Sequence, residues 1–386
     1  MTMLRRLNAS DEDFEVRFAA LVDANREAEE DVSRSVTRII ADVRARGDAA
    51  LIELSRRFDR VELSSGTLRV SVEEIAAAER GCAPDLKAAL HFAAARIEAY
   101  HRRQIPADEN FTDETGATLG WRWSPLASVG LYVPGGTASY PSSVLMNAIP
   151  ARVARVERVV MVSPASGGAI PPLTLVAAKI AGVSEIYRIG GAQAVAALAY
   201  GTATIAPVDK IVGPGNAYVA AAKREVFGRV GIDSIAGPSE ILVVADGTND
   251  PAWIAADLLS QAEHDASSQS ILITDDAGFA DLVAREVERQ LALLPRRDIA
   301  ERAWNAHGAI IVVARLDDAA HLVNRIAPEH LEIATDDPRA FFARVKHAGA
   351  VFLGRHTPEA VGDYIAGPNH VLPTSRTARF SSGLSV

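Results

Sequence analysis

The sequence predicts an α/β protein with parallel-rich sheets in two α/β units, preceded by a small helical segment at the N-terminus. Its 386 residues exceed what one hydrophobic core usually organises, so we expect at least two domains. From Val129 onward, short runs rich in β-branched residues end in glycine and lead into alanine-rich helices. The run 185–191, before a helix expected over 192–200, is one example. Such alternation is typical of βαβ units, which form parallel sheets.

The first hundred or so residues are predicted to be mostly helical. Between Val32 and Phe58, apolar residues recur at helical spacing. A second helical stretch begins at Ser71, which has a glutamate three residues on, a pair that resembles a capping box. We expect Gly81 and Pro84 to interrupt this second stretch.

A second α/β series begins at Ile241–Ala245. It continues through a helix at 252–263, a strand at 270–274, a helix at 279–294, strands at 309–313 and 331–334, a helix at 338–347 and a strand at 350–353. Ligands of such sheets usually bind beyond the carboxyl ends of the strands, so we expect the functional residues at those ends.

Composition excludes several classes of function. The net charge is −9 and lysine and arginine form no cluster, so we expect neither a nucleic-acid nor an anionic-membrane partner. The N-terminus lacks the apolar segment of a signal peptide, and the longest apolar runs have the length of strands. Cys82 is the only cysteine, so no internal disulfide can form. We therefore expect a cytoplasmic protein.

Three glycine-rich turns follow predicted strands, at 130–136, 190–193 and 213–218. A turn that opens a helix can bring backbone N–H groups close to a phosphate, and it can equally be a tight connection between strand and helix. None of the three has the spaced glycines of the dinucleotide-binding fingerprint, so the sequence does not predict standard Rossmann cofactor binding. Cofactor binding by a variant route stays open.

Gln261 and His264 are three residues apart near the end of a predicted helix, which Asp250 and Pro251 begin. Gln261 continues the apolar face of this helix, so we expect it to be buried and to need polar partners. Ideal geometry places His264 about 60° around the helix axis from it. With a distant carboxylate such as Asp363, the pair would form a mixed nitrogen and oxygen site that suits zinc. The alternatives are a histidine favoured near a helix C-terminus and a surface carboxylate.

Glu329 and His330 follow Pro328, where a loop is expected to become a strand. Catalytic side chains are common at such places, and histidine and glutamate are the usual general bases. The alternative is a solvated, polar start of a strand. His370, in Gly-Pro-Asn-His, is a further candidate and can equally be an ordinary loop residue.

Eight short motifs, in order, resemble those of the bacterial histidinol dehydrogenase family. They lie at 129–136, 190–194, 213–219, 236–240, 260–264, 327–331, 362–364 and 369–374. The resemblance runs from about residue 10 to the last residue, and eight ordered motifs are far more specific than any one of them.

The resemblance implies a role for each candidate residue. It implies NAD contacts for Tyr132, Gln193 and Asn216, zinc ligation by Gln261, His264 and Asp363, substrate binding by Ser239, Gln261, His264, His330, Asp363 and His370, and catalysis by Glu329 and His330. The implied cofactors are zinc and NAD, and the implied small-molecule substrate is L-histidinol.

The resemblance also implies an organisation into two incomplete Rossmann-like domains and a homodimer. The implied ranges are 1–27 for the helical segment, 28–131 with 240–380 for a discontinuous first domain, and 132–239 for the second domain. In the family, a C-terminal tail follows, with a substrate-binding glutamate and a zinc-binding histidine. We expect 381–386 to be the start of such a tail, which this chain does not continue.

The implied reaction is the oxidation of L-histidinol to L-histidine through L-histidinaldehyde, the last steps of histidine biosynthesis. Cys82 lies in the helical region, away from every motif, so we expect the aldehyde to react through its hydrate and not through a thiohemiacetal. We expect His330 to take the alcohol proton and Glu329 to activate water. Two alternatives stay open: a related dehydrogenase of another small alcohol or diol, and a zinc- or nucleotide-binding protein without turnover.

Overall fold

The structure, a computed structural model, describes residues 4–24, 30–135, 140–165 and 167–386. Residues at both ends of the predicted helical segment, and Gly136 of the first glycine turn, lie outside the described residues. The chain forms two compact units, each assembled from three segments. Unit 1 comprises 1–28, 236–362 and 372–383, and unit 2 comprises 29–235, 363–371 and 384–386.

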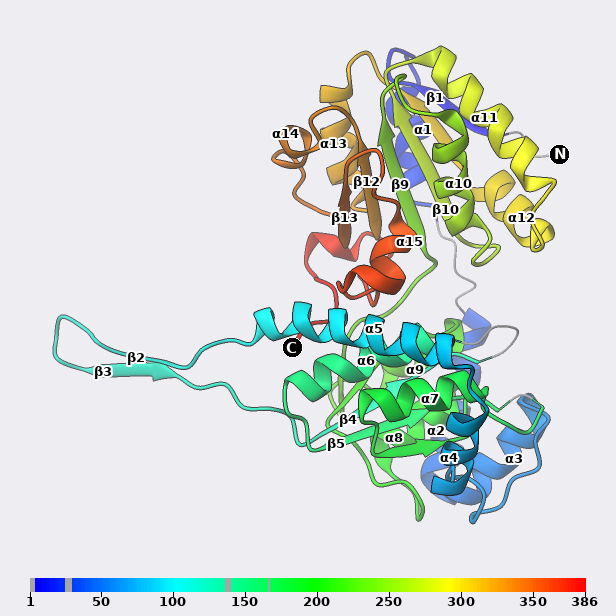
Figure 1. The fold of residues 1–386 in the computed structure, drawn as a ribbon, viewed down its shortest axis with the longest axis vertical. Helices are drawn as coiled ribbons and strands as arrows, with labels where there is room; N and C mark the ends of the chain where they lie inside the picture. The colour runs from blue at the N-terminus through cyan, green and yellow to red at the C-terminus, as the bar shows by residue number, and fades with distance from the viewer. Residues whose placement is uncertain (1–3, 25–29, 136–139, 166) are drawn as a thin grey trace. The chain divides into compact units, whose positions relative to one another are not determined.

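Unit 1 is built on a six-stranded, fully parallel sheet in the order β1-β11-β10-β9-β12-β13 (Figure 1). Its strands are β1 (Arg5–Asn8), β9 (Glu240–Ala245), β10 (Gln269–Thr274), β11 (Ala309–Val312), β12 (His330–Ala334) and β13 (Ala350–Leu353). From β9 onward the chain starts in the middle of the sheet, moves to one side, and reverses at β12. This is the doubly wound order, with its reversal between β9 and β12.

The two faces of this sheet carry separate cores. α1 and α13 pack on one face, and α10, α11 and α12 pack on the other. The helices of unit 1 are α1 (Phe14–Val22), α10 (Pro251–Ala262), α11 (Ala277–Leu291), α12 (Arg297–His307), α13 (Leu316–Ile326), α14 (Pro338–Phe342), α15 (Glu359–Val361) and the 3-10 turn η3 (Thr377–Arg379). The short π-helix η2 (Gly362–Ala366) continues directly from α15.

Unit 2 contains a five-stranded parallel sheet in the order β6-β5-β4-β7-β8. Its strands are β4 (Ser128–Tyr132), β5 (Arg158–Val162), β6 (Glu185–Tyr187), β7 (Lys210–Val212) and β8 (Gly231–Ile232). The order is again doubly wound, with its reversal between β4 and β7. The predicted α/β class with parallel sheets is therefore confirmed in both units.

Helices also cover both faces of the unit 2 sheet. They are α2 (Glu30–Arg46), α3 (Asp48–Phe58), α4 (Val72–Gly81), α5 (Pro84–His101), the 3-10 turn η1 (Arg102–Gln104), α6 (Pro141–Val153), α7 (Pro172–Ala181), α8 (Gly191–Tyr200) and α9 (Ala217–Val226). α2, α3, α8 and α9 share one core, and α4 to α7 share the other.

Two local predictions are confirmed by hydrogen bonds, and a third is corrected. Ser71 Oγ accepts from the Glu74 N–H at 3.2 Å, and the Ser71 N–H donates to the Glu74 carboxylate at 2.9 Å, which completes the capping box. Asp250 caps α10 as expected. The helical pattern at 32–58 is divided into α2 and α3 because Gly47, between them, has a φ of 56°.

The division into units differs from the predicted domain ranges. The segment 28–131 was expected to join 240–380, but α2 contacts α8 and α9, α4 contacts α7, and α5 contacts α6, all within unit 2. The cause is apolar burial, because α2 turns Val36, Ile40 and Val43 into the core it shares with α8. The N-terminal segment is also not purely helical, since β1 pairs with β11 along the edge of the unit 1 sheet.

A two-stranded antiparallel hairpin, which the sequence did not predict, leaves unit 2 between α5 and β4. Its strands are β2 (Glu109–Thr112) and β3 (Thr118–Trp121), and in Figure 1 it extends away from the body of unit 2. Every residue of both strands is exposed. The rings of Phe111 and Trp121 pack edge to face with their centroids 6.4 Å apart. Such a hairpin has little stability of its own in water, so its exposed apolar side chains are typical of a contact surface.

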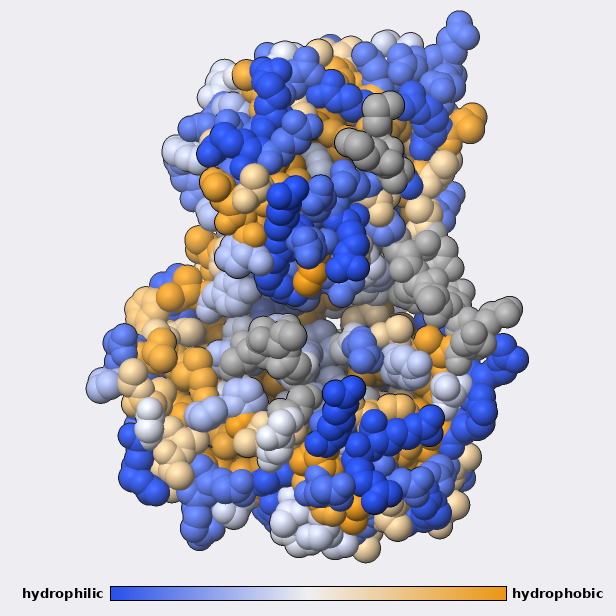
Figure 2. Space-filling view, turned by 90° about the vertical axis from the view of Figure 1, so that its right-hand side faces the viewer, coloured by the Kyte–Doolittle hydropathy of each residue, from blue (hydrophilic) through white to orange (hydrophobic). Residues whose placement is uncertain are grey.

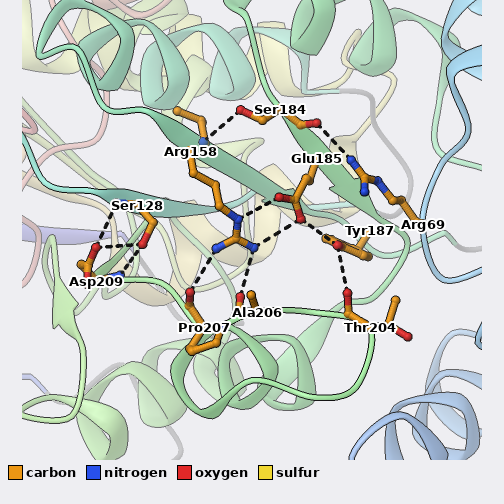
Figure 3. Close-up of polar contacts among 11 residues, drawn as sticks. Arg69, Ser128, Arg158, Ser184, Glu185, Tyr187, Thr204, Ala206, Pro207 and Asp209 are labelled. Carbon is orange, nitrogen blue, oxygen red and sulfur yellow. Dashed lines mark hydrogen bonds and ion pairs between the residues drawn. The ribbon is translucent and has the colours of Figure 1, made fainter.

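The strands of unit 2 begin at an edge that is closed by polar contacts (Figure 3). Arg158, at the start of β5, donates from Nε to Glu185 at 2.8 Å and from its other guanidinium nitrogens to two backbone carbonyls. This contact is the main reason that the pKa of Glu185 lies below its usual value. At the start of β4, Ser128 donates through its N–H and Oγ to Asp209 at 2.9 and 2.8 Å. This polar network occupies the edge of the sheet where the strands start.

Figure 2 shows hydrophilic and hydrophobic residues interspersed over one face of the chain. Among the described residues, every helix is too short or too polar to cross a membrane.

Candidate functional site

Unit 2 has a pocket of about 410 Å³ at the edge where its strands end. Tyr132, Gln193 and Asn216, the residues expected to contact NAD, all line it. Tyr132 is the last residue of β4, and Asn216 follows β7, so the pocket lies where the strand order reverses. Crevices at this point are the usual ligand sites of doubly wound sheets.

The three residues are held by the elements around them. The Tyr132 hydroxyl accepts from the Gly191 N–H at 2.9 Å, and burial raises the pKa of Tyr132 to about 12. Asn216 caps α9 by accepting from the N–H groups of Tyr218 and Val219. Gly213, which leads from β7 to this cap, has a φ of 111°, and a side chain there would collide with the Tyr132 backbone.

The N-terminus of α8 favours an anionic ligand in the same pocket. Its N-cap residue, Gly190, offers no capping side chain, and the first three residues of this ten-residue helix, Gly191, Ala192 and Gln193, line the pocket. Uncapped N–H groups and the helix dipole favour a phosphate at such a place. The turns around it therefore combine tight packing with an anion-binding surface.

Phe58, Asp59 and Tyr218, to which the sequence analysis gave no function, also line this pocket. Phe58 and Tyr218 are large aromatic residues that are 51% and 41% exposed, so flat rings are available to a ligand. Phe58 and Asp59 end α3, far from every motif, and only the packing of α3 on unit 2 brings them to the pocket.

In unit 1, the side chains of the expected catalytic pair both contact the backbone of Glu240. Glu329 Oε2 accepts from the Glu240 N–H at 2.9 Å, and His330 Nδ1 lies 2.9 Å from the Glu240 carbonyl oxygen. Because that carbonyl can only accept, His330 carries its proton on Nδ1 and presents Nε2 as the basic nitrogen. Both side chains are buried, at 6% and 3% exposure, so the alternative of a solvated strand start is wrong.

Glu359, which sequence reasoning missed, lies beside the basic nitrogen of His330. Its Oε1 is 3.8 Å from His330 Nε2, and Ser260 Oγ donates to its Oε2 at 3.1 Å. Glu332, two residues along β12, accepts from the Glu359 N–H at 2.6 Å and so fixes the start of α15. A carboxylate in this position can stabilise the imidazolium that forms when His330 takes a proton.

The two unit 1 residues expected to bind zinc lie at the C-terminal end of α10. Gln261 is 3% exposed as predicted, and its Oε1 is buried with no hydrogen-bond partner among the described residues. A buried amide oxygen of this kind needs a donor or a cation. His264 differs from the expectation, because α10 ends at Ala262 and His264 lies exposed in the following turn, not on the helix.

The remaining substrate candidates are divided between the units. Ser239 directly precedes β9 in unit 1, and its carbonyl accepts from the Gln269 N–H at 3.0 Å. Asp363 and His370 belong to unit 2, where His370 Nδ1 lies 3.0 Å from the Asp363 carbonyl oxygen. Asn369, beside His370, donates to the Met146 carbonyl at 2.6 Å and anchors this segment to α6.

The candidate residues of unit 1 lie at the opposite edge from the one predicted. Glu240, Gln269 and His330 begin β9, β10 and β12, so the site is where these strands start. The edge where they end is occupied by a polar network, in which Arg355 pairs with Asp246 at 2.7 Å. In unit 2 the corresponding edge carries the pocket, so of the two groups of candidate residues only the one in unit 2 lies at the carboxyl ends of its strands.

A pocket at the reversal of a doubly wound sheet and a buried Glu–His pair together define an α/β enzyme that works with a nucleotide cofactor. Residues 22–386 match the family described as histidinol dehydrogenase. The protein of that name from Ruegeria pomeroyi is 65% identical over 380 residues, which are 98% of this chain and 88% of the relative. The one from Rhizobium meliloti is 63% identical over 384 residues, which are 100% of this chain and 88% of the relative.

A solved structure agrees with these relatives. The crystal structure of histidinol dehydrogenase from Elizabethkingia anophelis superposes with a TM-score of 0.94 at 37% identity, and the match covers 99% of this chain and 87% of that one. The chain belongs to the histidinol dehydrogenase family. It is accordingly an NAD-dependent oxidoreductase that acts in two steps at the end of histidine biosynthesis.

Proposed function

We propose that the chain oxidises L-histidinol to L-histidine through L-histidinaldehyde, with proton transfer by Glu329 and His330. The observation that carries this proposal is that both side chains, buried and adjacent in sequence, are fixed by the same backbone unit at Glu240. Bound NAD would supply the hydride acceptor for each step, and zinc held by Gln261, His264 and Asp363 would supply a Lewis acid for nitrogen atoms of the substrate.

His330 is the base for the alcohol in this proposal. Its Nδ1–H is held by the Glu240 carbonyl, so the ring is oriented and Nε2 is the atom that takes the hydroxyl proton. Glu359, 3.8 Å from Nε2, stabilises the cation that results. The hydroxyl loses one proton and the adjacent carbon loses one hydride, which leaves the aldehyde.

Glu329 is the base for water in the second oxidation. The only cysteine, Cys82, follows α4 in unit 2 and belongs to neither group of site residues, so a thiohemiacetal is not available. Water adds to the aldehyde while Glu329 takes one of its protons, which gives the anion of the hydrate. This anion then loses a hydride to become the carboxylic acid.

We assign the zinc site to Gln261, His264 and Asp363. The buried Oε1 of Gln261 fits this role, because the amide oxygen has no partner among the described residues and imidazole and carboxylate suit zinc. Asp363 is four residues after Glu359 in the continuous run formed by α15 and η2. His330 and Glu359 also offer ligand atoms within 4.8 Å of one another, and we assign these two to proton transfer.

We place NAD in the unit 2 pocket, with contacts from Tyr132, Gln193 and Asn216. The uncapped start of α8 would face the pyrophosphate, and the exposed rings of Phe58 and Tyr218 would face the adenine. Ser239 and His370 are proposed to contact the substrate. We also propose a homodimer, which the exposed apolar side chains of the β2–β3 hairpin support.

The test is NADH formation from L-histidinol, with and without added zinc, on the full chain. We expect turnover that a chelator abolishes and zinc restores. Turnover of a different small alcohol alone would indicate a related dehydrogenase, and binding of zinc and NAD without turnover would indicate a non-catalytic protein.

A separate measurement tests the cofactor pocket. Tyr218→Ala removes an exposed ring and should weaken NAD binding in calorimetry, whereas Tyr100→Ala, an equally exposed ring outside the pocket, should not. Equal NAD affinity in the two variants would refute the pocket assignment.

A further inference from the structure

One acidic side chain in the unit 2 pocket has no function in the reaction described above. Asp59 lies at the end of α3 and lines the pocket beside Phe58. Its Oδ2 is buried and has no hydrogen-bond partner among the described residues. Burial raises the pKa of Asp59, and its charge contributes to the raised pKa of Tyr132 across the pocket.

This position is unfavourable for a carboxylate in the free protein. A buried oxygen without a donor loses the hydration it would have in water. Asp59 is also the C-cap of α3, and a negative charge at a helix C-terminus opposes the helix dipole. A ligand that brings hydrogen-bond donors to Oδ2 would offset both effects.

The composition of the pocket limits what that ligand is. Among the described lining residues, none is lysine or arginine, so Asp59 is the charged group that a ligand would meet there. Arg57 and Arg60 flank Asp59 in the sequence, but neither lines the pocket. Apart from Asp59, Tyr132 and Tyr218, none of the described lining residues is titratable, and we assign this part of the site to binding and not to reaction.

We propose that Asp59 accepts hydrogen bonds from the adenosine ribose hydroxyls of the cofactor and thereby selects NAD over NADP. A vicinal diol presents two O–H donors, and a carboxylate has the acceptors to pair with them. The 2′-phosphate of NADP would remove one donor and place a second negative charge beside Asp59. This inference rests on the proposed placement of NAD in the unit 2 pocket.

The experiment compares NAD and NADP binding by calorimetry for the full chain and two variants. Asp59→Asn removes the charge, and Glu62→Gln makes the same change at an exposed position three residues away that does not line the pocket. The expected result is that Asp59→Asn lowers the NAD-to-NADP preference by about 10- to 100-fold, the size of a lost hydrogen bond to a charged group. Glu62→Gln should keep the original preference.

A second readout needs no cofactor. Because Asp59 Oδ2 is buried without a partner among the described residues, Asp59→Asn should raise the melting temperature of the cofactor-free chain at pH 8, and Glu62→Gln should leave it unchanged. An unchanged NAD-to-NADP preference in Asp59→Asn would overturn the inference.

Tyr218→Ala distinguishes a wrong placement of NAD in the pocket from a wrong assignment of Asp59. If it weakens NAD binding while Asp59→Asn changes nothing, the pocket holds NAD and Asp59 is not the selector. If neither variant affects NAD binding, the pocket assignment and the inference are both wrong.

Discussion

The side chains of Asp257, on α10, and Glu332, on β12, are hydrogen-bonded to each other inside unit 1. Two ionised carboxylates cannot form such a bond, so the pair shares a proton. Burial is the main cause of both shifts: it raises the pKa of Asp257 to about 6 and that of Glu332 well above its usual value. Since Glu332 also accepts from the Glu359 N–H, this pair supports the carboxylate beside His330.

The shared proton predicts a pH-dependent loss of stability. An unfolded aspartate loses its proton near pH 4. Folded Asp257 keeps its proton to about pH 6, so the contribution to stability falls as the pH rises through this window. Asp257→Asn removes the titrating group. The melting temperature of this variant relative to the parent should therefore rise between pH 4 and pH 6, measured by thermal melts at each pH. A constant difference across this range would show that no proton is shared.

A buried ion pair predicts a large loss of stability in unit 2. Lys223 and Asp233 are paired at 2% and 4% side-chain exposure, and both also bond to the backbone of Gly213. Lys223→Met would leave Asp233 charged and uncompensated, which typically costs about 3–5 kcal/mol. We expect a loss of this size in urea unfolding, together with weaker NAD binding because Gly213 leads into the pocket.

The double variant Lys223→Met with Asp233→Asn serves as the control, because it leaves no charge unpaired. It should recover part of the lost stability. A double variant less stable than Lys223→Met alone would contradict the explanation.

Local patterns were sufficient to predict much of the fold, whereas long-range packing was not accessible to them. The capping box at Ser71 and the cap at Asp250 depend on residues within one turn, and both are confirmed. The assignment of α2 to unit 2 depends on contacts with α8 and α9, more than a hundred residues away. Periodicity shows that a helix is amphipathic but not which sheet it covers.

The same difference explains the outcome at the site. Glu329 and His330 were identifiable because they follow a proline at a strand start. Glu359 and Asp59 were missed because each acquires its surroundings from distant elements. The sequence placed the candidate residues of unit 1 at the wrong edge of the sheet. The pairing of Arg355 with Asp246, which occupies the expected edge, is not visible in either local sequence.

The zinc assignment predicts that His264→Asn lowers zinc content. His264 is exposed, so the substitution should leave the melting temperature of the metal-free chain unchanged. We expect lower zinc per chain by atomic absorption and lower kcat. His91→Asn, at an exposed position on α5, is the matched control and should keep its zinc. Equal zinc in the two variants would exclude His264 as a ligand.

We predict that substitutions in the β2–β3 hairpin weaken the proposed homodimer. Leu119 and Trp121 on β3 are 47% and 50% exposed. Replacing both with serine should lower the molar mass in light scattering at micromolar concentration from that of a dimer toward that of a monomer. The control is the double variant Val16→Ser with Leu293→Ser, which changes two exposed apolar residues outside the hairpin. A parent chain that is already monomeric would refute the proposed homodimer.

The last prediction separates the two oxidations. Neighbouring side chains on a strand point to opposite faces, but β12 begins only at His330, and Glu329 lies in the bend before it. This bend lets both side chains reach Glu240. His330→Asn should slow alcohol oxidation by roughly 10²–10⁴-fold, the usual contribution of a general base. Glu329→Gln should impair the aldehyde step more than the alcohol step, because it removes the base for water and leaves His330 in place.

The measurement supplies L-histidinol and L-histidinaldehyde separately to each variant and follows NADH in a single turnover. The structure adds a control, because Glu329 also holds the Glu240 N–H, and a glutamine can still accept that hydrogen bond through its amide oxygen. Glu329→Gln therefore tests the base, whereas Glu329→Ala tests the base and the position of β9 together. If Glu329→Gln oxidises the aldehyde at the parent rate while Glu329→Ala does not, Glu329 positions the site and another group activates the water.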